Sequence, residues 1–275
     1  MFPTERRKAM LKSILVAMGD QVEDVAALEY AYVLAKAYNA TLFGHLVIDI
    51  SEAGDKGLSL LKEGEFHIDT RQMLEDRGHE LLDRFEAQCR QRNITSETEV
   101  VVGDYKREIF QRMLEVDLGI LGVNEREPTL SPVVDLAVRS SPKPVLLVRG
   151  EYRTINKILV GFDKSALSGH CLQLGANLAE LIGARLILFT VAENIPDGQI
   201  TLASGARYLA RYKLEFTPIL KSGDVVQEIS DFVGQEECDL VIVGSRGHAR
   251  LRELLFSSTT QRILQRVGCP VLIYH

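Results

Sequence analysis

The sequence carries the same set of landmarks twice. Lys12-Ser-Ile-Leu-Val-Ala-Met18 matches Asn156-Lys-Ile-Leu-Val-Gly-Phe162 at an offset of 144 residues (156 − 12). Asp117-Leu-Gly-Ile-Leu-Gly122 recurs as Asp239-Leu-Val-Ile-Val-Gly244 at an offset of 122 (239 − 117). The landmarks keep their order while their spacing drifts, which indicates one structural unit that was duplicated and then diverged. The chain is therefore expected to fold as two copies of one unit.

Each copy alternates short apolar segments with amphipathic ones, which is typical of a parallel sheet with helices on both faces. We expect strands at residues 14–18, 42–48, 98–102, 118–123 and 145–148, and again at 158–162, 186–191, 214–220, 240–243 and 271–274. We expect helices at residues 22–38, 65–92, 105–115, 168–181, 225–233 and 259–267. The apolar spacing predicts that Ile109, Met113 and Leu114 point inward. It also predicts one apolar face with Val25, Leu28, Tyr32 and Ala35, and another with Cys171, Leu174, Leu178 and Leu181. The fold class is α/β: two tandem Rossmann-like domains, each an open five-stranded parallel sheet with helices on both faces.

The boundary between the copies falls in the polar link 149–154, which contains a glycine. We therefore assign residues 1–152 to one domain and 153–275 to the other. From the second strand to a recurring Gly-Asp pair, the first copy has 54 residues (103 − 49) and the second has 30 (223 − 193). The helix in that interval of the second copy must be short or partly missing. We expect the long helix of the first copy, or a second chain, to cover the sheet there.

Composition and charge exclude several classes of protein. With 275 residues, 46% hydrophobic and 25% charged, the chain has the composition of an ordinary globular protein. No apolar run reaches the ~18 residues of a membrane span, and residues 1–12 lack the apolar core of a secretory signal. A formal net charge of −6 does not suit a nucleic-acid binder, and the four cysteines have no metal-ligand spacing. We expect a soluble cytoplasmic protein that neither binds nucleic acid nor inserts into a membrane.

Ligands of open α/β sheets bind beyond the carboxyl ends of the strands, where the strand order reverses. In the second copy these ends carry Gly161 and Asp163, Val191, and Val243 and Gly244 with Gly247. The carboxylate of Asp163 follows its strand closely, so it either contacts a ligand or caps the helix that begins near Ser165. The second copy therefore predicts one binding site at this edge of its sheet.

The segment after the fourth strand of the second copy suits phosphate. Gly244 and Gly247 let backbone amides approach an anion without a Cβ atom in the way. Downstream, a helix opens on the hydroxyl residues Ser257, Ser258, Thr259 and Thr260. A helix N-terminus offers unpaired N–H donors and the positive end of the helix dipole. The first two serines either cap this helix or contact phosphate, and one residue can do both.

Two cationic residues lie inside the same loop. Arg246 and His248 either meet a phosphate or extend into solvent, and arginine is the stronger candidate because histidine is mostly neutral near pH 7. The sequence has no spacing of nucleophile, base and acid that indicates a catalytic triad, no Walker lysine motif and no G-x-G-x-x-G. We therefore assign no catalytic residue and no metal ligand.

Taken together, these residues resemble a tandem universal stress protein of the UspA superfamily, whose domains are adenine nucleotide alpha hydrolase-like. The resemblance covers nearly the whole chain as two copies. Nucleotide-binding members carry G-x2-G-x9-G-[S/T]; here Gly244, Gly247 and Ser258 fit, and Ser257 replaces the third glycine. The resemblance implies ATP, ADP or AMP as ligand, alone or with Mg²⁺. It places adenine against Asp163 and Val191, ribose and phosphates against the two glycines, and phosphates against Ser258 and Thr259.

The first copy departs further from this pattern. Gly19 stands at the position of Asp163, and Glu125 stands at that of Gly247 and would bring a negative charge to the phosphate position. We expect this half to bind no ATP and to serve as a structural or regulatory partner. The resemblance also implies that the last strands, 145–148 and 271–274, pair and form an internal pseudo-dimer, and it allows a homodimer of tandem chains.

Three functions are compatible with the sequence. The first is a stress-response or signalling module whose bound adenine nucleotide biases contact with an unknown protein partner. The second is an interaction or scaffold protein that kept the fold and lost the site. The third is a slow ATP hydrolase, which ranks lowest because no general base or pair of metal-binding carboxylates is evident beyond Asp163.

Overall fold

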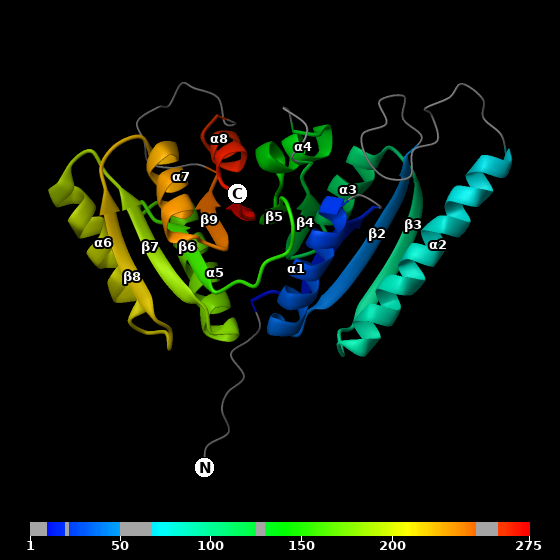
Figure 1. Ribbon diagram of the computed structural model, residues 1–275, viewed down its shortest axis with the longest axis horizontal. Coiled ribbons are helices and arrows are strands. Elements are labelled where there is room, and N and C mark those ends of the chain that lie inside the picture. The colour runs from blue at the N-terminus through cyan, green and yellow to red at the C-terminus, as the bar shows by residue number, and fades with distance from the viewer. Residues whose placement is uncertain (1–9, 20–21, 50–67, 125–129, 246–257) are drawn as a thin grey trace, which may run out of the picture.

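The computed structural model describes residues 10–19, 22–49, 68–124, 130–245 and 258–275. Ten strands form one continuous sheet in the order β3-β2-β1-β4-β5-β10-β9-β6-β7-β8 (Figure 1). The strands of the N-terminal half are β1 (Ser13–Met18), β2 (Thr41–Asp49), β3 (Ser96–Gly103), β4 (Leu118–Gly122) and β5 (Val145–Val148). Those of the C-terminal half are β6 (Lys157–Gly161), β7 (Arg185–Val191), β8 (Phe216–Lys221), β9 (Leu240–Gly244) and β10 (Val271–Tyr274).

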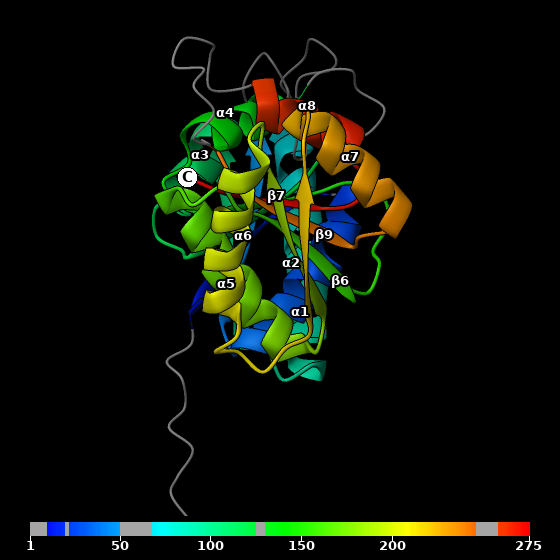
Figure 2. The ribbon, with the colours of Figure 1, turned by 90° about the vertical axis from the view of Figure 1, so that its left-hand side faces the viewer.

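Eight helices are present in the described part of the chain. They are α1 (Val22–Tyr38), α2 (Ile68–Gln91), α3 (Tyr105–Met113), α4 (Pro132–Ser140), α5 (Ala166–Ile182), α6 (Ile195–Leu209), α7 (Val225–Glu236) and α8 (Ser258–Arg266). Residues from α1, α2, α5 and α6 share one hydrophobic cluster, and residues from α3, α4, α7 and α8 share the other. The two clusters lie on opposite faces of the sheet, as Figure 2 shows for α5 and α6 against α7. None of the described helices is long and apolar enough to cross a membrane.

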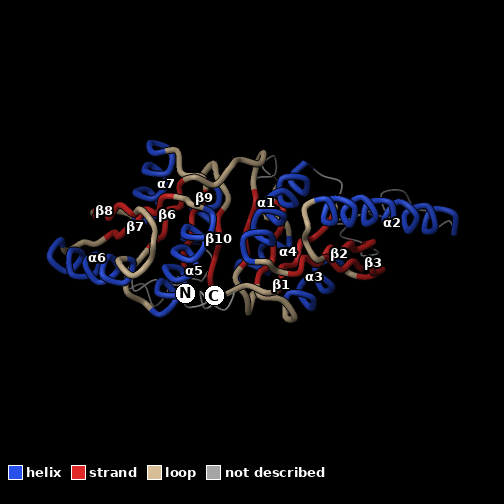
Figure 3. The backbone as a smooth tube through the Cα atoms, turned by 90° about the horizontal axis from the view of Figure 1, so that it is seen from below, coloured by secondary structure: helices blue, strands red, loops and turns tan. Residues whose placement is uncertain are grey.

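The two halves meet through one antiparallel strand pair. Within each half the five strands are parallel, whereas β5 and β10 run in opposite directions, with Val145 opposite Ile273 and Leu147 opposite Val271. Seen from below, β10 lies near the middle of the molecule, between β6–β8 and β1–β3 (Figure 3). The predicted pairing of 145–148 with 271–274 is confirmed. Its result is one ten-stranded sheet built from two five-stranded ones.

The expected strands are all present, with ends that differ by at most two residues. Two helices, α4 and α6, were not expected as such. Three members of the predicted apolar faces do not lie in the core: the side chains of Val25, Leu114 and Leu181 are 60%, 52% and 48% exposed. Leu114 is the C-cap of α3, where the helical repeat no longer sets the direction of a side chain.

Helix α6 has 15 residues against the 24 of α2, so the prediction of a short helix in the second copy is confirmed. This helix itself packs on β7 and β8, whereas α2 packs on β2 and β3 at the far end of the molecule (Figure 1). Cover by the long helix of the first copy was therefore a wrong expectation. A 15-residue helix of about 22 Å is long enough for strands of six and seven residues.

One aspartate in each half ties the first strand of that half to its fourth. Asp239 Oδ2 accepts hydrogen bonds from the backbone N–H groups of Asn156 and Lys157, at 2.8 and 2.9 Å. Asp117 Oδ2 accepts from the N–H groups of Lys12 and Ser13, at 2.8 and 3.2 Å. The same bond in both copies supports the duplication and fixes where β1 and β6 begin.

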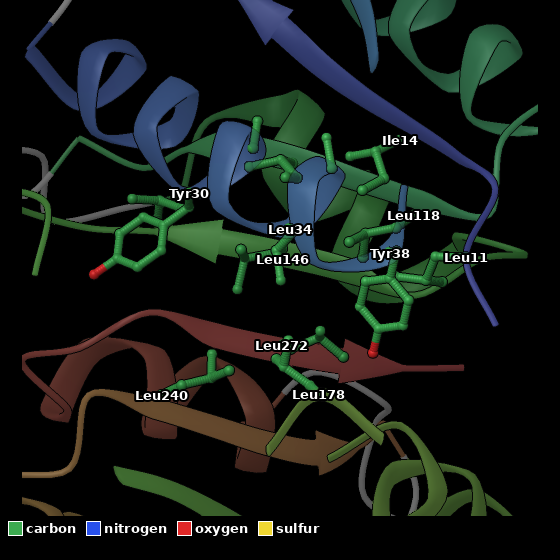
Figure 4. Packing of buried hydrophobic residues seen from close by; sticks show 14 of the residues in the cluster. Leu11, Ile14, Tyr30, Leu34, Tyr38, Leu118, Leu146, Leu178, Leu240 and Leu272 are labelled. Carbon is green, nitrogen blue, oxygen red and sulfur yellow. The ribbon is translucent and has the colours of Figure 1, made fainter. Parts of the chain in front are cut away.

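The link between the halves is packed against α1. The rings of Tyr30 and Tyr152 lie 4.9 Å apart, edge to face, and the Tyr30 hydroxyl accepts a hydrogen bond from Arg153 N–H at 3.1 Å. Figure 4 shows Tyr30 and Tyr38 of α1 beside Leu146 of β5 and Leu272 of β10. Helix α1 therefore packs against both strands of the central pair, within one of the two hydrophobic clusters.

Replacement of the tying aspartate should destabilise the fold. Asp239→Ala leaves two backbone N–H donors without their charged acceptor, so we expect the free energy of unfolding to fall by about 2 kcal/mol in urea denaturation. Asp231→Ala is the matched control, because that carboxylate binds only Gln227 on the exposed surface of α7 among the contacts described, and its loss should cost less than about 0.5 kcal/mol. Equal losses for the two variants would contradict this role.

The hydroxyl of Tyr38 is buried and has no hydrogen-bond partner among the described residues. Tyr38→Phe removes a polar group that burial disfavours, so the free energy of unfolding should stay constant or rise by up to about 1 kcal/mol. In the matched variant Tyr30→Phe, the lost bond to Arg153 should cost about 1 kcal/mol. Thermal and urea unfolding of both variants test the difference, and a Tyr38→Phe loss as large as that of Tyr30→Phe would refute it.

Candidate functional site

The predicted site lies where three parallel strands of the C-terminal half end. Strand β6 has β7 on one side and β9 on the other, so the strand order reverses between β6 and β9. In this register Gly161 pairs with Phe189 of β7, and Val160 pairs with Ile242 of β9. The carboxyl ends of the three strands therefore lie side by side, and we call this place the edge of the half. They bring together the predicted residues Gly161, Val191, Val243 and Gly244.

Asp163 is held in a tight turn between β6 and α5. Its Oδ1 accepts a hydrogen bond from Ser165 N–H at 3.0 Å, and its own N–H donates to Ser168 Oγ at 3.3 Å. The N-cap of α5 is Ser165, whose side chain accepts from Ser168 N–H at 3.2 Å. Of the two predicted roles, helix capping thus falls to Ser165. Asp163 remains half-buried at the strand edge with a carboxylate orientation set by the turn.

The neighbouring backbone is fixed by bonds between β6 and β7. Phe162 N–H donates to Phe189 O at 2.8 Å, and the buried hydroxyl of Thr190 donates to Phe162 O at 2.9 Å. These bonds fix the chain immediately before Asp163 next to the end of β7, which carries Val191, the predicted second adenine contact. The two residues are therefore placed on adjacent strand ends by rigid backbone.

The predicted phosphate side is described in part. Ser245 N–H donates to Tyr274 O at 2.8 Å, which fixes the start of the loop after β9. Arg246, Gly247, His248 and Ser257 lie outside the described residues. Helix α8 begins at Ser258, so Ser258 and Thr259 open a helix as predicted. The first N–H groups of an α-helix have no partner within the helix itself, so this end of α8 is where an anion would be expected.

The thiol of Cys171 in α5 lies close enough to Asp163 to interact with its carboxylate electrostatically. Cys171 of α5 is fully buried, and burial, with a smaller contribution from Asp163, raises the pKa of its thiol to about 12. The thiol is therefore neutral near pH 7 and is a poor nucleophile. Within the described ranges, no group of three His, Cys, Asp or Glu side chains is arranged to hold a metal ion.

The corresponding edge of the N-terminal half is filled by its own side chains. A Cβ atom on Gly19, the counterpart of Asp163, would lie 2.2 Å from Oδ2 of Asp24. Asp24 and Asp49 are 6% and 1% exposed. The carboxylate that the C-terminal half carries in its loop is thus replaced here by one from the first turns of α1.

An aromatic ring adds to this filling. Tyr105 opens α3 directly after the N-cap Asp104, as Val225 opens α7 after Asp224. Tyr105 is 4% exposed and Val225 is 38% exposed. Burial raises the pKa of the Tyr105 hydroxyl, and the nearby carboxylates of Asp24 and Asp49 raise it further. The two copies therefore differ in openness at equivalent positions.

Comparison with known proteins identifies the family of the chain. A model of the Universal stress protein family (Usp) matches residues 10–149 and 199–275. The chain belongs to the universal stress protein family. Asp163 and Val191 lie in the stretch between the two matched regions. The fold and its order of strands nevertheless repeat in both halves of this universal stress protein.

Individual relatives extend the comparison. Universal stress protein Slr1230 of Synechocystis is 30% identical over 139 residues, which cover 50% of this chain and 48% of Slr1230. The match thus spans about half the length of that relative. Universal stress protein YxiE of Bacillus subtilis is 25% identical over 144 residues, 43% of this chain and 97% of YxiE. The crystal structure of a universal stress protein from Archaeoglobus fulgidus matches with a TM-score of 0.79 at 18% identity, covering 95% of this chain and 97% of that one, which establishes the shared tandem fold.

Some residues that shape the two edges were missed in the sequence. Ser165, Ser168 and Thr190 position Asp163 and its strand, but such bonds depend on the turn that the backbone makes. Tyr105 and Asp24 did leave a signal. The offset of 144 pairs Asp24 with Ser168 (168 − 24), and the offset of the Gly-Asp pair, 120 (223 − 103), pairs Tyr105 with Val225.

Proposed function

We propose that the C-terminal half binds an adenine nucleotide, ATP, ADP or AMP, at the joint ends of β6, β7 and β9. The observation that carries the proposal is the convergence of Asp163, Val191 and Gly244 at the point where the strand order reverses, together with the N-terminus of α8, the helix that follows β9 in the chain. Members of the universal stress protein family often bind adenine nucleotides. The bound nucleotide would bias how the protein meets a protein partner in a stress response.

The residues present fit such a ligand. Val191 is half-buried and Val225 is 38% exposed, so the C-terminal edge offers apolar surface for a base where the N-terminal edge holds the buried Tyr105. Asp163 and Val191 would contact adenine, and the backbone at Gly244 and Gly247 would contact ribose and phosphates. The hydroxyls at Ser257, Ser258 and Thr259, with Arg246 or His248, would supply donors and positive charge to the phosphates. A Mg²⁺ ion would accompany the phosphates of ATP.

In this proposal the N-terminal half, residues 1–152, binds no nucleotide and serves the C-terminal half, residues 153–275, as a partner. The buried carboxylates of Asp24 and Asp49 support it, because they would repel an anionic ligand at that edge. The cytoplasmic location also remains a prediction. Catalysis beyond slow ATP hydrolysis is not expected, since the sequence shows no general base or pair of metal-binding carboxylates beyond Asp163.

The binding of a single nucleotide per chain is the first test. Mass spectrometry of the ligand released on denaturation, with titration calorimetry of the ligand-free protein, should find an adenine nucleotide at a stoichiometry close to one. A stoichiometry near two would refute the closed N-terminal half. If no nucleotide co-purifies and none binds, the chain is instead a nucleotide-independent interaction protein.

A charge placed in the loop tests the location of the site. Gly247→Glu reproduces the glutamate found at the same position of the N-terminal half and should weaken nucleotide binding at least tenfold by repulsion of phosphate. Gly234→Glu is the matched control. Its side chain would point into open space on α7, and it adds the same charge to the same half. Calorimetry should find wild-type affinity for the control, and equal effects of both variants would place the site elsewhere.

A further inference from the structure

Arg149, the first residue after β5, reaches from the N-terminal half to α8. Its guanidinium Nη1 donates a hydrogen bond to the carbonyl oxygen of Leu264, in the last turn of α8. The last carbonyls of a helix have no partner within the helix, and a cation beside them also interacts favourably with the helix dipole. Arg149 thus holds the C-terminal end of the helix whose N-terminal end faces the proposed phosphate position.

Helix α8 has further supports within its own half. Arg266 Nη1 donates to Gln227 Oε1 at 2.8 Å, and Arg262 Nη2 lies 3.5 Å from Asp224 Oδ1; both partners belong to the first turn and N-cap of α7. On the inner side, Ile263 is 2% exposed and packs in the core. These contacts fix α8 against α7 and the sheet, whereas Arg149 fixes it from the other half of the chain.

The position of Arg149 follows from the central strand pair. Leu147 lies opposite Val271 at the start of β10, so a residue two positions further reaches the turn between α8 and β10. The repeat offset of 126 (269 − 143) makes His275 its counterpart in the C-terminal half. Histidine is shorter and lacks the five donors of a guanidinium. The residue type at this position therefore differs between the halves, and the arginine contacts the half proposed to bind nucleotide.

We propose that Arg149 is a positioning residue for phosphate: it holds α8 so that the N–H groups at its other end face the nucleotide phosphates. The N-terminal half thereby contributes to nucleotide affinity without touching the ligand. This inference rests on the proposed nucleotide site. It predicts a specific signature, since loss of the arginine should weaken contacts to phosphate and leave contacts to adenosine intact.

Binding of ATP and of adenosine to the full-length protein separates these contributions. For Arg149→Met, we expect ATP affinity to fall about three- to tenfold, by calorimetry, while adenosine affinity, measured by competition with a fluorescent adenine nucleotide, stays within about twofold. Arg149→Lys keeps a cation and donors at the helix end and should retain most of the ATP affinity. Arg139→Met is the matched control, because that arginine pairs with Asp135 inside α4. It should leave both affinities unchanged.

The outcomes distinguish this inference from the function on which it rests. A parallel loss of ATP and adenosine affinity in Arg149→Met would show a general structural defect and overturn the positioning role. Unchanged ATP affinity would overturn it too, while the nucleotide site itself would stand. If the wild-type protein binds neither ligand, the proposed function fails and the inference fails with it. A selective loss of ATP affinity, reversed by Arg149→Lys, supports it.

Discussion

The antiparallel pairing of β5 with β10 is the interaction on which the rest of the molecule depends. An open sheet edge exposes unpaired N–H and C=O groups, and these groups bond to each other when two such edges pair. Val145, Leu146, Leu147 and Val271 are each completely buried, so the pair also joins the cores of the two halves on both faces of the sheet. Because these two edges are used within the chain, they are not available to another copy. A homodimer of tandem chains would have to use a different surface.

A covalent pseudo-dimer allows its two sites to diverge, which a dimer of identical chains cannot do. In the N-terminal half, Tyr105, Asp24 and Asp49 fill the space at the carboxyl ends of the strands. In the C-terminal half, Val225 stands at the position of Tyr105, and Ser168 stands at that of Asp24. Burial of a tyrosine ring stabilises the half that carries it, by about 25 cal/mol for each Å² of apolar surface removed from water. The closed half thus gains packing where an open edge would remain solvated. The proposed division of roles between a supporting half and a binding half rests on this difference.

Much of the fold could be predicted, because each buried strand corresponds to a local apolar run, such as 14–18 or 240–243, and these runs recur in both halves. The pairing of the last strands was likewise predicted and confirmed. Helix α6 could be predicted only as short or partly missing, since its segment contains two glycines that lower helix propensity. One of these glycines is required by packing, because a Cβ atom on Gly198 would lie 2.6 Å from Leu220 and 2.8 Å from Ala192. Close approach of helix and sheet demands the glycine, and that demand is visible only in three dimensions.

The candidate site shows the same limit at finer scale. The alternation of strands and helices located the strand ends, since parallel strands have their carboxyl ends on the same side of the sheet. The orientation of Asp163 required the turn to be seen, because Ser165 and Ser168 each bind the loop around it. A carboxylate already bonded to a backbone N–H group has little rotational freedom left to lose, so ligand binding at this edge would carry a smaller entropic cost. Ser165, which caps α5, therefore also orients Asp163, so one turn serves both helix capping and the proposed ligand contact.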